Sequence, residues 1–87
     1  MDAVFTPIYK NAEIEIVVED DIITTAKIYM DGEFAYGGEV ENENYPNGLP
    51  FNGKNYHAIK TLCAKQIDKM LAEDGRDECI DMKLVRR

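Results

Sequence analysis

Apolar and polar side chains alternate in three successive runs over the first half of the chain. The clearest run covers residues 13–19, where every second position is Ile or Val and glutamates fill most of the others. Residues 22–30 and 33–41 continue the pattern and are rich in β-branched and aromatic side chains. Such alternation is typical of strands with one buried face. The sequence therefore predicts three strands in this half.

The segments between these runs have the composition of tight turns. Asp20-Asp21 separates the first two runs and Asp31-Gly32 separates the second from the third. Asp and Gly tolerate the positive φ that two-residue hairpin turns need, so an antiparallel meander is expected. Gly37-Gly38 predicts a bulge or a close backbone approach. Residues 4–9 are a candidate edge strand, limited by Pro7.

The second half contains one helical pattern. Six apolar residues form one continuous stripe at helical spacing, namely Ile59, Leu62, Cys63, Ile67, Met70 and Leu71. Asn52 or Asn55 is the expected N-cap, and Gly75 is expected to end the helix. Residues 79–86 alternate again and predict a last strand. We expect one α+β domain over residues 1–87, with βββαβ order and the amphipathic helix on one face of a small antiparallel sheet.

The two-residue turns also predict which side chains share a face. Val18 is expected opposite Ile23, and Tyr29 opposite Phe34. The face under the helix should carry Ile14, Ile16, Val18, Ile23, Thr25, Tyr29, Phe34, Tyr36 and Val40. The outer face should carry Glu13, Glu15, Glu19, Glu33, Glu39 and Glu41 around an apolar centre of Val17, Ile22, Ala26, Ile28 and Met30.

Charge is divided unevenly along the chain, whose net charge is −7. Residues 1–53 hold 11 acidic side chains against Lys10 and Lys27, whereas residues 54–87 hold six acidic and eight basic ones. The acidic half would repel nucleic-acid phosphates, so direct nucleic-acid binding is not expected there. Solubility alone is the simplest alternative explanation of the charge.

Candidate catalytic chemistry is sparse. His57 is the only histidine, and its six-residue spacing from Cys63 places the two on different sides of a helix. Cys63 falls on the apolar stripe, and no histidine is placed by sequence to activate Cys79. General acid–base catalysis needs a carboxyl group in a buried setting, whereas the glutamates of this chain alternate toward solvent. No catalytic residue, metal site or cofactor is predicted.

The N-terminus has neither a basic nor an apolar signal-peptide region, and no apolar run approaches the length of a membrane span. We expect a cytoplasmic protein, in the host cell cytoplasm if it is phage-encoded. Its two thiols should be reduced.

These features favour a stoichiometric binding protein. Small acidic proteins without catalytic residues are a common format for phage inhibitors of anti-restriction or anti-CRISPR type, which mimic nucleic acid; this is an analogy of class only. The acidic face would dock on the basic nucleic-acid-binding surface of a partner protein. The expected contact residues are Glu13, Glu15, Glu19, Asp20, Asp21, Glu39, Glu41, Ile28 and Met30.

Three alternatives remain open at this stage. A homodimer or accessory subunit would bury a strip formed by Ile22, Ile28 and Met30. A nucleic-acid-binding module would use the lysines of the helix and the aromatic residues of the loop before it. An enzyme or a small-ligand binder is the third.

Overall fold

The computed structural model describes residues 1–41 and 43–73. The strands are β1 (Ala3–Phe5), β2 (Ile8–Tyr9), β3 (Ala12–Glu19), β4 (Ile22–Met30), β5 (Glu33–Glu39) and β6 (Leu49–Pro50). One helix, α1 (Gly53–Glu73), follows them. The last predicted strand, residues 79–86, and the predicted helix stop, Gly75, lie outside the described residues.

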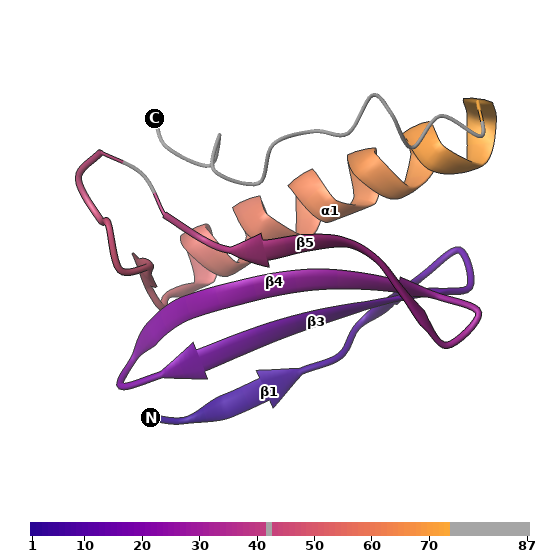
Figure 1. The fold of residues 1–87 in the computed structure, drawn as a ribbon. Helices are drawn as coiled ribbons and strands as arrows, with labels where there is room; N and C mark the ends of the chain where they lie inside the picture. Colours follow the sequence, from indigo (N-terminus) through magenta and orange to yellow (C-terminus); the bar gives the residue numbers. More distant parts are fainter. Residues whose placement is uncertain (42, 74–87) are drawn as a thin grey trace.

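The strands form one antiparallel sheet in the order β1-β3-β4-β5, with β2 paired to β3 and β6 paired to β4. Helix α1 lies along one face of this sheet, and none of the described elements covers the opposite face (Figure 1). The expected α+β fold, a small antiparallel sheet with one helix packed on it, is therefore confirmed. The N-terminal strand, which the sequence left open, joins the sheet beside β3.

Three two-residue turns fold the meander. Asp20 and Asp21 both have positive φ, as do Asp31 and Gly32, which confirms the two predicted hairpin turns. A third turn of this kind, Lys10–Asn11, joins β2 to β3. The sequence analysis missed this third turn because Lys rarely adopts positive φ.

The core lies between the sheet and the helix. It is made mainly of isoleucines, with Ile16, Ile23 and Ile28 from the strands and Ile59 and Ile67 from α1 all fully buried. Alternation along β3 and helical spacing along α1 bring these side chains to one interface. Burial of a side chain of this size stabilises the fold by about 1.5–3 kcal/mol.

A register shift between β3 and β4 changes which side chains face the helix. Val18 lies opposite Ile23 as predicted, but Val17 lies opposite Thr25, so Thr24 is an extra residue in β4. A β-bulge of this kind reverses the alternation that follows it. Ile28 and Ala26 are consequently buried, and the prediction that they lie on the outer face is wrong.

Because of the same bulge, Thr25, Tyr29 and Met30 also lie on the opposite side of the sheet from the one predicted. Thr25 and Tyr29 lie on the face away from the helix, not under it, because each alternates with a buried neighbour. Met30 returns to the helix side, where it is partly buried against the core. The prediction that Met30 lies on the outer face is therefore also wrong.

A second register shift lies between β4 and β5. Tyr29 lies opposite Phe34, as predicted, whereas Ile28 lies opposite Tyr36, which leaves Ala35 as the extra residue. Phe34 is consequently 57% exposed on the outer side, although it was expected under the helix, and Tyr36 packs against the core.

Helix α1 begins as expected and buries most of its predicted stripe. The side-chain Oδ1 of Asn52 accepts a hydrogen bond of 2.7 Å from the backbone N–H of Asn55, which identifies Asn52 as the N-cap. Ile59, Cys63 and Ile67 are fully buried. Leu71 is 55% exposed, so the predicted stripe ends one residue earlier, at Met70.

The glycine pair in β5 fulfils the predicted close approach. Gly37 has a φ of +119°, and a Cβ at this position would lie 2.3 Å from the carbonyl oxygen of Ala26 in β4. Gly38 has open space around it. Of this pair, Gly37 alone needs to be glycine for both conformational and steric reasons.

Candidate docking face

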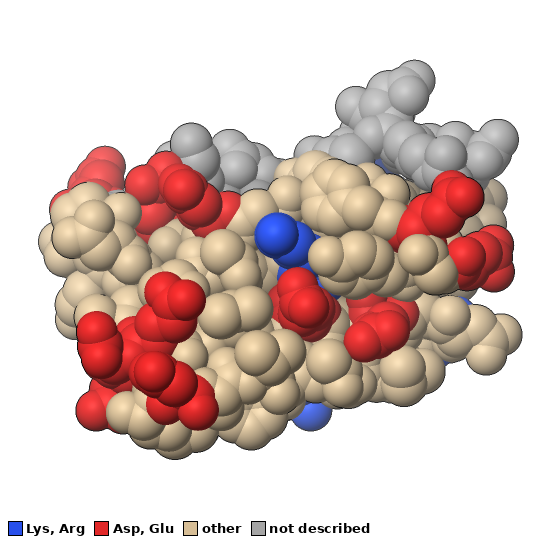
Figure 2. Space-filling view, turned by 60° about the horizontal axis from the view of Figure 1, so that its bottom comes forward, with Lys and Arg blue, Asp and Glu red and all other residues tan. Residues whose placement is uncertain are grey.

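The sheet face opposite the helix is the candidate site, and we call it the open face. Its side chains come from alternate positions of four strands: Val4, Glu13, Glu15, Val17, Glu19, Thr25, Lys27, Tyr29, Phe34 and Glu39. Figure 2 shows acidic groups spread over the surface in this view, outnumbering the basic ones, with a dense acidic group at one end.

The carboxylates of the open face form no ion pair with another described residue. Glu13, Glu19 and Glu39 are exposed, and Glu15 is half-buried. Glu15 lies directly opposite Lys27, the only basic residue of the open face, yet no ion pair joins them. Two ion pairs of the described residues, Met1–Asp21 and Lys10–Asp68, do not involve any open-face glutamate. The four carboxylates of this face therefore outnumber its one described lysine, and the face carries a net negative charge.

Apolar side chains occupy the end of the open face near the β4–β5 turn. The rings of Tyr29 and Phe34 meet edge to face, with centroids 5.9 Å apart. Ile8 lies in the same cross-strand row, opposite Glu13, and is 67% exposed. Exposed aromatic side chains beside charged ones are typical of protein interaction surfaces.

The two aspartates at the β3–β4 turn are already engaged in local contacts. The N-terminal ammonium of Met1 donates to Asp21 Oδ1 at 2.7 Å, and this contact raises the pKa of that ammonium. The backbone N–H of Asp20 donates to Asp2 Oδ1 at 2.8 Å. Asp20 and Asp21 themselves remain exposed, as the sequence predicts.

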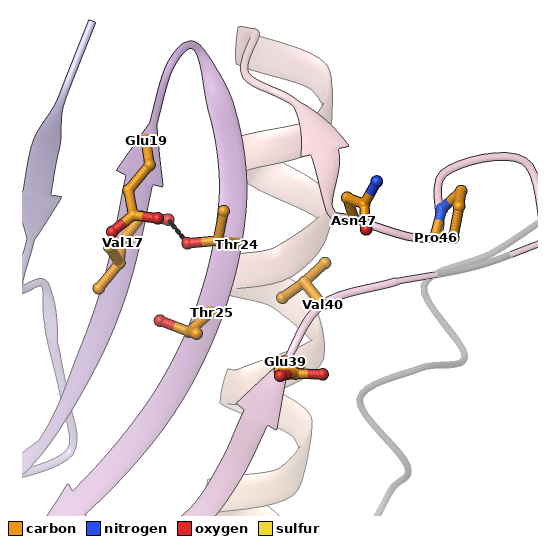
Figure 3. A pocket seen from close by; sticks show the side chains of 8 residues that line it. All are labelled: Val17, Glu19, Thr24, Thr25, Glu39, Val40, Pro46 and Asn47. Atoms are coloured by element: carbon orange, nitrogen blue, oxygen red, sulfur yellow. Dashed lines mark hydrogen bonds between the residues drawn. The ribbon is translucent and has the colours of Figure 1, made fainter.

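A hollow of about 380 Å³ opens at the same end of the sheet. It lies where β5 leaves β4, and the bulge residue Thr24 lines it together with Thr25 (Figure 3). Glu19 from β3 and Glu39 from β5 add two carboxylates. The remaining lining residues are Val17, Val40, Pro46 and Asn47.

Four of the nine predicted contact residues lie together on the open face: Glu13, Glu15, Glu19 and Glu39. Glu41 follows the end of β5 and is half-buried. Ile28 is fully buried under the helix, so the predicted strip of Ile22, Ile28 and Met30 is not an exposed surface. The sequence does not indicate Tyr29, Phe34 and Lys27 as open-face residues, because the bulges lie at Thr24 and Ala35 and not at Gly37-Gly38, where the glycine pair suggested one.

The residues considered for catalysis are separate from one another. Cys63 is buried, and burial raises the pKa of its thiol to about 12, which keeps it protonated at neutral pH. His57 is exposed near the start of α1, and its Nε2 lies 3.5 Å from Thr61 Oγ1. No group of three or more His, Cys, Asp or Glu side chains suited to a metal ion occurs in the described part of the chain. Cys79 lies outside it.

Two aromatic residues near the start of the helix, Phe51 before it and Tyr56 in its first turn, are committed to packing, whereas Tyr45 in the preceding loop is exposed. Phe51 stacks on Phe5 with centroids 5.6 Å apart, and Tyr56 meets both rings edge-on. Lys60 lies over the Tyr56 ring at 5.5 Å. These rings are therefore poorly placed to stack on nucleic-acid bases, which weakens the nucleic-acid-binding alternative.

Comparison with protein-family models, with curated proteins and with solved structures finds no match to this chain. A search of the described residues for a helix long and apolar enough to cross a bilayer finds none.

Proposed function

We propose that the protein is a non-enzymatic binding protein whose open face docks on a basic surface of a partner protein. The observation that supports this most is the set of four glutamates on one uncovered sheet face, none of which is ion-paired within the described residues. Unneutralised charge of one sign accelerates association with a partner of opposite charge and disfavours other partners.

The charge of the open face also bears on the alternatives. A second copy docking through the same face would bring four glutamates against four others, with only Lys27 of each copy to offset them. Like charges brought together in this way disfavour association. A homodimer through this face is therefore a poorer explanation than a basic partner, and nucleic acid would be repelled for the same reason.

The partner surface that we propose is one that normally binds nucleic acid. Alternate residues of a strand are about 6.7 Å apart, so Glu13 and Glu15 form a short line of negative charge along β3. A groove that binds a phosphate backbone recognises repeated negative charge with little regard to sequence. The protein would then act as a stoichiometric inhibitor in the cytoplasm, in the manner of anti-restriction or anti-CRISPR proteins.

Affinity capture with charge-reversed variants tests this proposal. The open-face variant would carry Glu13, Glu15 and Glu39 changed to Lys. A matched control would carry the same three-charge reversal at acidic residues outside the open face, namely Asp31, Glu33 and Glu43. Circular dichroism would first establish that both variants fold.

Supporting results would be specific. The captured protein, identified by mass spectrometry, should bind the wild type and the control but not the open-face variant. Its purified form should release bound DNA or RNA when about one equivalent of the wild type is added. Capture that is equal for both variants, or a captured protein that keeps its nucleic acid, would contradict the proposal.

A further inference from the structure

We infer that the hollow between Glu19 and Glu39 receives an arginine side chain of the partner and anchors it on the open face. This inference rests on the proposed function, because it names the group on the basic surface that enters a particular part of the open face. It differs from that proposal in assigning a chemically selective pocket instead of a general attraction between charges.

The hollow exists because the ladder is interrupted. Strand β5 pairs with β4 up to Thr25, and β6 pairs with β4 from Ile23 back to Ile22. Thr24 lies between these two pairings, and its carbonyl oxygen accepts from the backbone N–H of Val40 at 3.0 Å. The turn at 46–47 borders the resulting gap. The hollow is therefore set by backbone structure and does not depend on the rotamer of one side chain.

The hollow has both parts that a guanidinium side chain requires. Its polar part consists of two carboxylates, two threonine hydroxyls and the Asn47 side chain, all of which can accept N–H donors. Its accessible apolar part is formed by Val17 and Pro46, which suit the aliphatic stem of a long side chain. Neither carboxylate has an ion-pair partner in residues 1–41 and 43–73.

Arginine fits these acceptors better than lysine does. Its planar guanidinium carries five N–H donors in a fixed fork and can bond two carboxylates at once. A lysine ammonium is a more compact and more strongly hydrated charge, and it has three donors. The oxygens of Glu19, Glu39 and Thr25 come from three different strands around the hollow (Figure 3). Acceptors that are spread out in this way favour the guanidinium group, which is wider than an ammonium group and carries more donors.

An NMR titration with defined peptides tests this inference without knowledge of the partner. The probes are a Gly-Arg-Gly-Arg-Gly peptide and its lysine counterpart. The arginine peptide should shift the amide signals of Thr24, Thr25 and Val40 in a saturable way and bind more tightly than the lysine peptide. The Glu19→Gln, Glu39→Gln double variant should weaken binding by about tenfold, the loss expected when charge-assisted hydrogen bonds are removed.

A second double variant on the same face controls for general charge. Glu13→Gln with Glu15→Gln removes the same charge outside the hollow and should leave arginine binding within about twofold, because neither residue lines the hollow and salt screens charges that are not in contact. Equal weakening by both double variants, or equal binding of the two peptides, would overturn the inference. The capture experiment separates this inference from the proposed function. If the open-face variant fails to capture the partner but the Glu19→Gln, Glu39→Gln variant still captures it, the proposed function is supported and the arginine site alone is contradicted.

Discussion

Glu19 and Glu39 lie on β3 and β5, two strands that are not neighbours, and they line the same hollow across the intervening strand β4. The extra residue Thr24 makes this arrangement possible, because it lies between the part of β4 that pairs with β5 and the part that pairs with β6. The bulge thus acts on both faces of the sheet. It buries Ile28 under the helix and shapes the polar hollow on the other side.

The side assignment of β4 and β5 predicts losses of stability of different size for two large side chains. Ile28→Ala should lower the free energy of unfolding by about 2–5 kcal/mol, because it leaves a cavity in the core. Phe34→Ala removes an exposed ring and its edge contact with Tyr29, at a cost of about 0.5–1.5 kcal/mol. Urea unfolding measures both, and a larger loss for Phe34→Ala would contradict the assignment.

The two glycines of β5 should respond differently to the same substitution. Gly37→Ala places a Cβ against the Ala26 carbonyl at a positive φ and should destabilise the protein by more than about 2 kcal/mol. Gly38→Ala is the matched control, and it should change stability by less than about 1 kcal/mol, because nothing obstructs the added methyl group. Thermal unfolding of the pair would show the difference. Equal effects would mean that β4 and β5 do not approach as closely at Gly37 as described.

Asp68 links the helix to the β2–β3 turn and predicts a pH dependence. Its carboxylate accepts from Lys10 Nζ at 2.8 Å and from Tyr9 Oη at 3.0 Å. The hydrogen bond from Lys10, followed by that from Tyr9, lowers the pKa of Asp68 in the folded state. A carboxylate of lowered pKa stabilises the fold above its unfolded pKa of about 3.9, and this stabilisation is lost as the pH falls through the folded-state value.

The variant Asp68→Asn isolates this contribution. The wild type should be more stable than the variant at neutral pH, and the difference should shrink once the pH falls below about 4. Urea titrations at a series of pH values would measure it. A difference that stays constant down to the lowest pH would show that the carboxylate charge of Asp68 is not responsible.

Cys63 should be chemically inert while the protein is folded. The thiol is fully buried and its pKa is raised to about 12, so very little thiolate is present at neutral pH. Iodoacetamide labelling, followed by peptide mass spectrometry, should find Cys63 unmodified in the native protein and modified in guanidinium chloride. Equal labelling rates in the two states would contradict its burial.

The sequence predicts the parts of the fold that depend on local chemistry. Strand β3 alternates without interruption, Asp31-Gly32 is a strong hairpin signal, and Asn52 is a good helix cap. The structure confirms each of these predictions. The strand, the hairpin turn and the helix cap are each determined by a few neighbouring residues.

The composition of the open face was predicted only in part. Its glutamates on β3 were correct because β3 has no extra residue, whereas Ile28, Tyr29 and Phe34 were assigned to the wrong sides. A bulge at Thr24 or Ala35 has no turn residue or glycine to mark it, and it is determined by how the strands pack against α1. One extra residue in a strand is enough to move all the side chains that follow it to the opposite face of the sheet.

The measurement that tests the central claim most directly is the association rate constant with the captured partner, followed by stopped-flow fluorescence at increasing salt. Unneutralised glutamates on the open face should make association of the wild type fall steeply with ionic strength, because salt screens exposed charges. The Glu13, Glu15 and Glu39→Lys variant should associate slowly at every salt concentration, and the Asp31, Glu33 and Glu43→Lys control should retain most of the wild-type rate. A rate independent of salt, or one lowered equally by both variants, would contradict docking through the open face.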